Sequence, residues 1–351
     1  MLTYIVILLC GISIEVFCQN NTIVFQSGES GYSCIRIPSL LTTSKGTLLA
    51  FGEGRLLTCA DDTQKDIVYK RSTNNGQTWS ELKILVRGNA SSDSFNRVGN
   101  FVPVQLRYNQ RILVPFTKND VWLMQSFSDD DGLTFSIPEM IVNVTKPEWK
   151  FLMLGPPNGL LLRSNRVVVP GAFSLGNPYA TSDFVMLNDH NGQVDKWYLG
   201  GIITLENYHP NECQAVELSK NNSIFVNSRT VDIVRVGSYS DDGGLTFSRS
   251  QVLKTLTEPR DGCEGSTIYH ESTRHLFYSG LAVNGSARTN LTLYASEDEG
   301  ENWSVVKLIY SGPSAYSSLA ILSDQSIGIL FEGGLKNPYE YFFFTIIYNK
   351  I

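Results

Sequence analysis

The amino-acid sequence predicts an all-β protein, a six-bladed β-propeller that spans residues 19–351. Three observations support this fold class. One turn pattern recurs four times, its copies keep a constant period, and the segments between them are rich in Val, Ile, Tyr and Phe with almost no helical periodicity. A repeated unit of several strands and one characteristic turn is typical of a propeller blade, and closing the blades into a ring hides the sheet edges.

The repeated turn reads Ser-x-Asp-x-Gly-x-Thr-aromatic, with small variations. Its four copies are Ser72–Trp79, Ser128–Phe135, Ser240–Phe247 and Ser296–Trp303. Their starts, at residues 72, 128, 240 and 296, lie 56, 112 and 56 residues apart, so one copy is missing near residue 184. Asn188–Gly192, followed by Trp197, resembles a degraded copy with an insertion. The period of 56 residues divides residues 19–351 into about six units, which predicts six blades.

The residue types of the turn favour a structural role. An Asp or Asn side chain accepts hydrogen bonds from nearby backbone N–H groups, Gly supplies a positive φ, and the aromatic side chain packs between sheets. Calcium binding is the alternative for the acidic second copy, but no copy supplies the alternating ligands and the final Glu of an EF-hand loop. No Cys-x-x-Cys pair occurs either. We therefore expect neither a metal nor a cofactor.

The first 18 residues differ from the rest of the chain. Residues 5–9 are apolar, and Val16 and Cys18 occupy the small-residue positions before a cleavage site, so residues 1–18 are expected to be a secretory signal peptide. A membrane anchor is the alternative, but Glu15 interrupts the apolar run before the roughly 20 residues that a span needs. The apolar run 341–348 is also too short, so it predicts a buried strand and no transmembrane segment.

The glycosylation sequons support a secretory route, and together with the signal peptide they predict a secreted or lysosomal protein. Asn-x-Ser/Thr sites begin at Asn20, Asn89, Asn143, Asn221, Asn284, Asn290 and Asn302. The net charge is −6 and no basic run occurs, so we expect no nucleic-acid partner, and an anionic ligand must be attracted by local positive charge. We expect a monomer. Four cysteines remain after removal of the signal peptide, and they allow three disulfide pairings.

An arginine within an apolar strand indicates a binding site. Arg36 lies in the sequence Ile35-Arg36-Ile37-Pro38, and a buried guanidinium is costly unless it is paired or binds an anion. Arg-Ile-Pro ahead of the spaced turns resembles the sialidase (neuraminidase) family with its Asp-box repeats, over nearly all of residues 19–351. The resemblance implies a propeller enzyme, an exo-α-sialidase of the glycoside hydrolase class, whose partners are sialylated glycans.

The resemblance also implies a carboxylate-binding site made of three arginines. The family positions match Arg36, Arg229 and Arg288. A guanidinium presents a planar fork to a carboxylate, and charged hydrogen bonds of this kind are about twice as strong as neutral ones. A surface salt bridge would explain any one of these arginines, whereas three at family positions favour the anion site. Glu332 matches the family Glu that braces the first arginine, and an exposed loop Glu is its alternative.

The family nucleophile is a tyrosine, which matches Tyr316, and its base matches Glu212. Sialidases are an exception to the usual pair of glycosidase carboxylates. Sialic acid carries a carboxylate on its anomeric carbon, which would repel a carboxylate nucleophile but not a neutral phenol. An unperturbed tyrosine has a pKa near 10, so it needs a base to lose its proton during attack. The implied mechanism retains configuration through a covalent sialyl–tyrosine.

The resemblance places the general acid on the loop that follows Glu53. Aligning residues 66–72 with the family strand selects Asp61, with Asp62 as the alternative. Arg55, in Glu53-x-Arg55, and Asn100 resemble further positions that line the sugar pocket.

Two other functions remain open at this point. A trans-sialidase, or an enzyme that releases an internal anhydro sugar, would share these residues and differ in acceptor access or water exclusion. A non-catalytic glycan-binding propeller would need the turns but not the nucleophile and its base. Some animal sialidases carry sugar-contacting tyrosines where this chain has Val169–Ser174, so the substrate preference also stays open.

We predict two disulfides, Cys34–Cys59 and Cys213–Cys263. The first would tether the loop that bears Asp61 to the strand that bears Arg36.

Overall fold

The computed structural model describes residues 21–88, 97–177, 179–205 and 208–348. The expected signal peptide, residues 1–18, and the sequons at Asn20 and Asn89 lie outside these residues. The helices that they contain are two 3₁₀ turns, η1 (Glu29–Gly31) and η2 (Val194–Lys196). Within the same residues, no helix has the length and apolar character needed to cross a membrane. The prediction of an all-β fold is confirmed.

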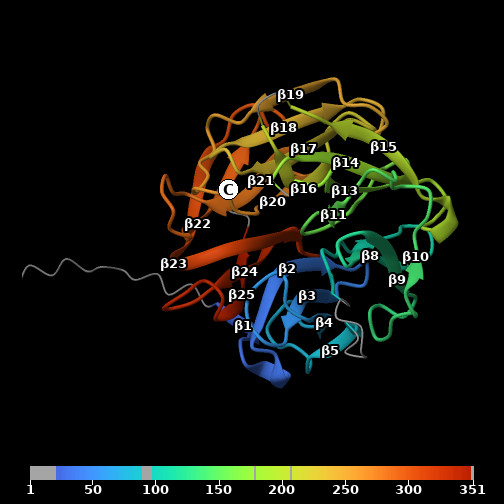
Figure 1. The fold of residues 1–351 in the computed structure, drawn as a ribbon. Helices are drawn as coiled ribbons and strands as arrows, with labels where there is room; N and C mark the ends of the chain where they lie inside the picture. The colour runs from blue at the N-terminus through green and yellow to red at the C-terminus, as the bar shows by residue number, and fades with distance from the viewer. Residues whose placement is uncertain (1–20, 89–96, 178, 206–207, 349–351) are drawn as a thin grey trace, which may run out of the picture.

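The strands form antiparallel sheets that follow one another around a centre, in a propeller-like arrangement (Figure 1). The first sheet contains β2 (Cys34–Thr42), β3 (Leu48–Arg55), β4 (Lys65–Ser72) and β5 (Lys83–Val86). The second contains β6 (Val98–Gly99), β7 (Val104–Gln105), β8 (Ile112–Lys118), β9 (Trp122–Ser128) and β10 (Glu139–Met140). The third contains β11 (Phe151–Leu154), β12 (Leu160–Leu161), β13 (Val167–Ser174), β14 (Thr181–Asn188) and β15 (Tyr198–Ile203).

The remaining strands complete the ring. The fourth sheet contains β16 (Pro210–Glu217), β17 (Ile224–Thr230), β18 (Arg235–Ser240) and β19 (Arg249–Val252). The last sheet has seven strands, β20 (Ser266–His270), β21 (His275–Leu281), β22 (Thr289–Ser296), β23 (Ser304–Ile321), β24 (Ile327–Gly333), β25 (Tyr341–Ile347) and β1 (Thr22–Gln26). Residues 341–347 of the run 341–348 form a strand, as predicted, and this strand pairs with β1, so the two ends of the described chain close in one sheet.

Each repeated turn is closed by hydrogen bonds between its own residues. In the second copy, the Gly132 N–H donates to Ser128 Oγ at 2.8 Å and the Thr134 N–H donates to Asp130 Oδ1 at 2.9 Å. The same two hydrogen bonds occur in the other three intact copies. In the first copy the acceptor is the amide oxygen of Asn74, which replaces the aspartate without loss of the bond. The turns therefore have the structural role that their residue types predict.

The degraded copy of the turn is confirmed. Asn188 Oδ1 accepts a hydrogen bond from the Gly192 N–H at 3.0 Å, four residues on, as the serine does in an intact copy. Trp197 follows Asn188 by nine residues instead of seven, and η2 lies in this insertion. The Trp197 side chain is nevertheless buried, and its indole donates to Gln125 at 2.9 Å.

The glycine of each turn packs against the neighbouring sheet. A Cβ added to Gly132 of the second sheet would lie 2.8 Å from Leu49 of the first, and one on Gly76 of the first would lie 2.0 Å from Phe344 of the last. Gly192, Gly244 and Gly300 contact the sheet before their own in the same way. These contacts therefore pass once around the ring, and the turn requires Gly for close approach as well as for its positive φ.

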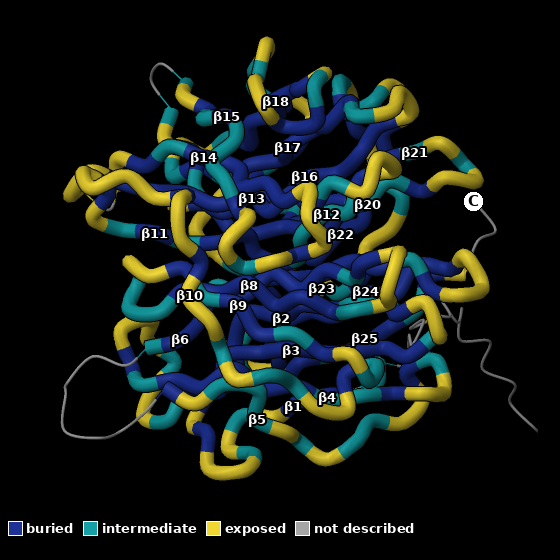
Figure 2. Tube along the Cα trace, turned by 90° about the vertical axis from the view of Figure 1, so that its right-hand side faces the viewer, coloured by how far each residue is buried: buried dark blue, intermediate teal, exposed yellow. Residues whose placement is uncertain are grey.

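The core lies between the sheets. Figure 2 shows the strands largely buried and the connecting loops exposed. The aromatic residues of the turns belong to this core: Phe135 meets the Tyr69 ring edge-on at 5.0 Å, and Trp303 meets Tyr278 at 5.9 Å. The repeated turns lie at one end of the sheets, so the loops and strand ends at the opposite end are not constrained by the turn motif.

Candidate active site

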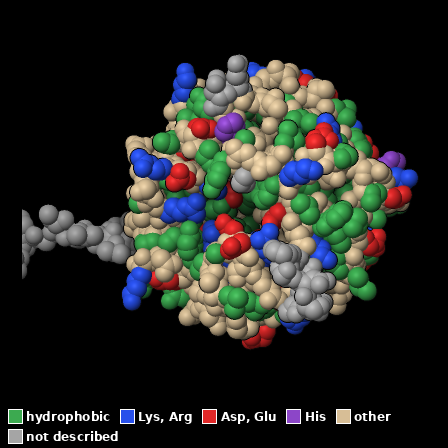
Figure 3. All heavy atoms as spheres, viewed as in Figure 1, with side chains coloured by type: hydrophobic (Ala, Val, Ile, Leu, Met, Phe, Trp, Pro, Cys, Tyr) green, Lys and Arg blue, Asp and Glu red, His purple; other side chains and the backbone are tan. Residues whose placement is uncertain are grey.

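Charged side chains of both signs gather around a hollow near the middle of the face shown in Figure 3. Three of the predicted site residues lie at irregularities in strand pairing, where a strand shifts its register against the neighbouring strand. The shifts fall between Arg36 and Ser39 on β2, between Pro210 and Cys213 on β16, and between Ser314 and Ser317 on β23. Bulges of this kind re-aim side chains at the edge of a site, and here they present Arg36, Glu212 and Tyr316.

Arg36 and Glu332 form a buried bidentate ion pair. Arg36 Nε donates to Glu332 Oε1 at 2.8 Å, and Nη2 donates to Oε2 at 3.0 Å. Glu332, on β24, is fully buried and also accepts the backbone N–H groups of Ile37 at 3.0 Å and Tyr316 at 3.2 Å. One carboxylate thus joins the first arginine to the backbone of the predicted nucleophile.

Ile37 holds a strained conformation beside this pair. Its φ is 61°, a value that β-branched residues rarely adopt, and its N–H donates to Glu332. Such a strained conformation is kept where many surrounding contacts fix the backbone, often next to a functional site. The strain turns the chain between Arg36 and Pro38.

Tyr316, Glu212 and Arg229 meet at one point. The Tyr316 hydroxyl donates a short hydrogen bond to Glu212 Oε1. Arg229 Nη1 donates to Glu212 Oε2 and, at 3.0 Å, to the Tyr316 oxygen. Burial raises the pKa of Tyr316 well above its ordinary value and Glu212 adds to the rise, while Arg229, Arg288 and Arg36 oppose it. In the folded protein the phenol therefore keeps its proton and has a carboxylate placed to receive it.

The third arginine approaches the same tyrosine. The guanidinium carbon of Arg288 lies 5.6 Å from the Tyr316 ring centroid, and that of Arg36 lies 4.9 Å from it. Tyr339, which the sequence analysis did not select, binds both arginines. Its ring stacks on Arg36 at 4.2 Å and its hydroxyl accepts from Arg288 Nη1 at 3.2 Å. Nothing in the sequence marks Tyr339 among sixteen tyrosines.

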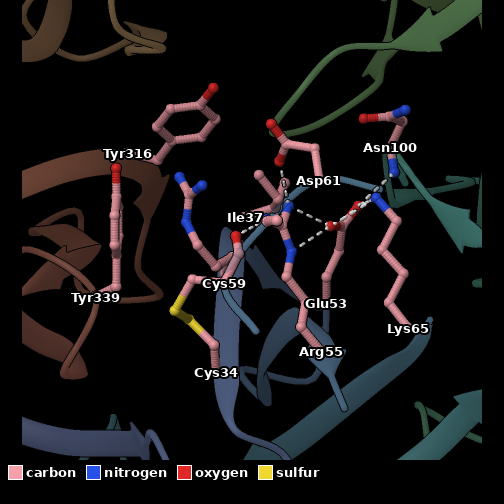
Figure 4. Close-up of polar contacts among 12 residues, drawn as sticks. Cys34, Ile37, Glu53, Arg55, Cys59, Asp61, Lys65, Asn100, Tyr316 and Tyr339 are labelled. Atoms are coloured by element: carbon pink, nitrogen blue, oxygen red, sulfur yellow. Dashed lines mark hydrogen bonds and ion pairs between the residues drawn. A yellow bond between two sulfur atoms is a disulfide. The ribbon is translucent and has the colours of Figure 1, made fainter. Parts of the chain in front are cut away.

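Glu53 is the centre of a second charged cluster. Figure 4 shows this fully buried carboxylate bound by Arg55, Lys65 and the backbone of Asn100. Arg55 Nη2 donates to it at 2.7 Å, Lys65 Nζ at 3.0 Å and the Asn100 N–H at 3.1 Å. Burial alone would raise the pKa of Glu53, but Lys65 and Arg55 outweigh it and lower the pKa to about 2. The alternation Glu53-x-Arg55 on a strand could have predicted the pair, whereas Lys65 had no signal.

Asp61 lies at the outer side of this cluster. Its Oδ1 is 2.7 Å from Arg55 Nη2, and its side chain is 84% exposed. No ion pair of Asp62 occurs among the described residues, so the contact with Arg55 favours Asp61. The Asn100 side chain donates to Thr117 Oγ1 at 3.2 Å, and its φ is 50°. All the predicted site residues except the exposed Asp61 are thus buried or half-buried.

The disulfide Cys34–Cys59 is confirmed. Cys59 lies in the loop 56–64 and Cys34 begins β2, so the bond ties the loop of Asp61 to the strand of Arg36. The carbonyl of Cys59 also accepts a short hydrogen bond from Arg55 Nη1. The disulfide and Arg55 together fix the chain on the N-terminal side of Asp61.

The predicted Cys213–Cys263 bond is wrong, because both cysteines are free and buried. Cys213 packs in the core cluster of the third and fourth sheets, with its sulfur 3.7 Å from the Gly171 carbonyl oxygen. Cys263 packs in a different cluster, with Tyr316 and Phe277. The two thiols occupy separate layers of the core, so an even number of cysteines did not imply two bonds.

Comparisons with known proteins agree with this architecture. Residues 46–329 match the model of the BNR repeat-like domain family. Sialidase-2 of Rattus norvegicus is 27% identical over 354 residues, which cover 89% of this chain and 92% of that protein. A Hadza microbial sialidase superposes with a TM-score of 0.83 at 24% identity, covering 94% of this chain and 68% of that one. The intramolecular trans-sialidase from Ruminococcus gnavus superposes with a TM-score of 0.77 at 17% identity, covering 94% and 97%.

The family model spans most of the chain, and the curated relatives that match it nearly end to end include mammalian sialidases. The chain therefore belongs to the BNR repeat-like domain family and is a sialidase homologue, which confirms the resemblance found in its sequence.

Proposed function

We propose that this protein is an exo-α-sialidase that hydrolyses terminal sialic acids of glycoproteins, glycolipids or oligosaccharides and retains the anomeric configuration. One observation carries the proposal: the Tyr316 hydroxyl donates to Glu212, and Arg229 donates to both. A nucleophile, its base and an anion-binding cation share a single point. This combination joins recognition of an acidic sugar to covalent chemistry.

The charges around Tyr316 suit an anionic substrate. Arg36, Arg229 and Arg288 supply three positive charges, and Glu332 and Glu212 neutralise two of them. One positive charge remains for the carboxylate of sialic acid, although the chain as a whole carries a net charge of −6. Local charge thus overcomes the global field, and bidentate guanidinium contacts orient the carboxylate.

The first chemical step forms a covalent intermediate. Tyr316 Oη attacks the anomeric carbon while its proton passes to Glu212 Oε1 along the existing hydrogen bond. The bond from the anomeric carbon to the leaving oxygen breaks, and Asp61 in its acid form donates a proton to that oxygen. The products are the shortened glycan and a sialyl–tyrosine.

The second step releases sialic acid. Asp61, now a carboxylate, takes a proton from water, whose oxygen attacks the anomeric carbon. The bond to Tyr316 Oη breaks, and the phenolate recovers its proton from Glu212. Two displacements at one carbon retain its configuration. The 84% exposure of Asp61 leaves it open to both the leaving group and water.

A transferase is the second candidate. One of the similar structures is an intramolecular trans-sialidase. Such an enzyme would form the same covalent intermediate, and a sugar hydroxyl instead of water would then attack it. A non-catalytic sialoglycan-binding propeller would use the arginines alone and would not need the bond between Tyr316 and Glu212.

The proposed setting is a secreted or lysosomal six-bladed propeller. Residues 304–313 of β23 pair with β22, and residues 314–321 pair with β24. This division supports the interpretation of the seven-stranded sheet as two four-stranded blades that share β23, which with the other four sheets would make six. The expected signal peptide and sequons support the secretory route.

The test is turnover of a chromogenic α-sialoside by wild type and Tyr316→Phe, with the product anomer followed by NMR and lactose present as an acceptor. We expect α-sialic acid as the first product and a loss of roughly 10³-fold or more in kcat for the variant. Sialyl-lactose as the main product would favour the transferase. Binding without release by wild type would favour the binding protein.

A further inference from the structure

A third buried glutamate lies beside the nucleophile, and neither the family resemblance nor the mechanism above uses it. Glu264 stands in the segment before β20 and is 1% exposed. Its Oε2 accepts the backbone N–H of Ser317 at 2.8 Å. Ser317 directly follows Tyr316, so Glu264 and Glu332 hold the backbone on the two sides of the nucleophile.

Glu264 differs from the other buried glutamates of the site in having no cation. Glu332 pairs with Arg36 and Glu212 pairs with Arg229, whereas none of the ion pairs among the described residues includes Glu264. Arg235, whose charge acts on Glu264, is bound to Glu258 at 2.8 Å. Glu264 Oε1 has no hydrogen-bond partner among the described residues. An ionised carboxylate in this position would be buried, unpaired and half unsatisfied, which is far more costly than a neutral acid.

The electrostatic surroundings of Glu264 also favour its neutral form. Burial raises the pKa of Glu264 well above its ordinary value, and the negative charges of Glu212 and Glu332 add to the rise against Arg235 and the Ser317 N–H. The titratable and charged groups that act on Glu264 are Glu212 on β16, Arg235 on β18, Cys263 beside it, Tyr278 on β21 and Glu332 on β24.

We propose that Glu264 is a positioning residue that works as a neutral acid. Its carbonyl oxygen holds the nucleophile strand through the Ser317 N–H. Its neutrality preserves the single positive charge that three arginines and two carboxylates leave for the substrate. An ionised Glu264 would cancel that charge before the substrate arrives. This inference rests on the proposed function for its kinetic part, and its charge part applies equally to a protein that only binds sialic acid.

The experiment compares Glu264→Gln with Glu264→Leu in the full chain. Gln keeps an acceptor for Ser317 and is always neutral, so kcat and KM for the α-sialoside should stay within about twofold of wild type between pH 4 and 8. Leu loses the acceptor, so kcat should fall roughly 10-fold while KM stays within about twofold. If Glu264 had a role in stability alone, Glu264→Leu would not lower kcat while leaving KM unchanged, and Glu264→Gln would not restore the wild-type kinetics.

Two results would overturn the inference. A KM at least 10-fold lower in Glu264→Gln would mean that the wild-type residue is ionised, and an unchanged kcat in Glu264→Leu would remove its positioning role. Should Glu264→Leu fail to fold, Glu264→Asp replaces it, because a side chain one methylene shorter cannot reach Ser317. Glu217→Gln and Glu217→Leu are the controls. Glu217 also accepts backbone N–H groups, from Arg163 and Asn222, but at the opposite end of β16, so these variants should lower stability and leave kcat and KM unchanged.

Calorimetric binding of the sialic acid analogue DANA separates this inference from the proposed function. If wild type releases no sialic acid, the proposed function fails. The charge part is then decided by the dissociation constant of Glu264→Gln, which should equal that of wild type. Binding at least 10-fold tighter by Glu264→Gln would contradict it.

Discussion

The two ends of the propeller are built from different kinds of interaction. At the end with the repeated turns, the bonds that define each turn close within four residues of chain, as in the bonds of Asp130 and Ser128. At the end with the site, the two central pairs join residues far apart in sequence: Arg36 and Glu332 are 296 residues apart, and Tyr316 and Glu212 are 104 apart. The local bonds recur in every turn, whereas each of these long-range pairs occurs once and positions a charge. The first kind should affect stability alone, whereas the second kind should affect activity as well as stability.

The largest expected effect is at the site, from Glu332→Gln. The change leaves Arg36 buried without its charge partner and weakens the anchor of the Tyr316 backbone. We expect the free energy of unfolding to fall by about 3 kcal/mol and kcat/KM to fall by roughly 10²-fold, measured by denaturant titration and initial rates.

The matched control is Asp131→Asn in the second turn. Asp131 also pairs with an arginine, Arg71 at 3.2 Å, but at the other end of the propeller. It should lower stability and leave kcat/KM within about twofold. If Glu332→Gln and Asp131→Asn lowered kcat/KM equally, the two ends of the propeller would not differ in their effect on activity.

The second effect is a pH dependence of stability that comes from Glu53. Its pKa is about 2 in the folded protein against an ordinary 4.5, so its stabilisation is complete above about pH 4.5 and is lost as the pH falls toward 2. A shift of this size corresponds to about 3 kcal/mol. Denaturant titrations from pH 2 to 6 should show the difference between wild type and Glu53→Gln shrinking as the pH falls. A difference that stays constant with pH would contradict the assignment.

The third effect concerns the Cys34–Cys59 disulfide, which should stabilise the fold and hold the loop of Asp61 in place. Cys34→Ser combined with Cys59→Ser should lower the free energy of unfolding by roughly 2–3 kcal/mol, because it frees a loop of 25 residues in the unfolded chain. It should also lower kcat roughly 10-fold, since the Cys59 carbonyl no longer fixes Arg55 beside Asp61. Thermal unfolding and initial rates measure the two losses. A drop in stability with unchanged kcat would show that the loop needs no tether.

The smallest effect is in the repeated turn itself. Asp130→Ala removes the acceptor for the Thr134 N–H and should cost about 1 kcal/mol of stability with no change in kcat. Asp130→Asn should cost less, because Asn74 makes the same bond in the first copy. Denaturant titration distinguishes the two variants. An Asp130→Asn variant as unstable as Asp130→Ala would mean that the carboxylate charge matters in the turn.

The same contrast explains how much the sequence predicted. The turns were found because each is complete within eight residues, and even the degraded copy at Asn188 kept its local bond. The site residues could be selected only through the family resemblance, since no spacing links Arg36 to Glu332. Lys65 and Tyr339 act on other site residues and not through a motif, so only their packing reveals them. The predicted Cys213–Cys263 bond was wrong because a count of cysteines carries no information about which cluster of the core each cysteine occupies.

The most direct test of the central claim is to trap the covalent intermediate. Incubation with 2,3-difluorosialic acid, followed by proteolysis and mass spectrometry, should place one sialyl group on the peptide that contains Tyr316. The adduct should be absent from Tyr316→Phe and should form more slowly in Glu212→Gln, which cannot take the phenol proton. An adduct on Glu212, or turnover of an α-sialoside by Tyr316→Phe at the wild-type rate, would contradict the assignment of Tyr316 as the nucleophile.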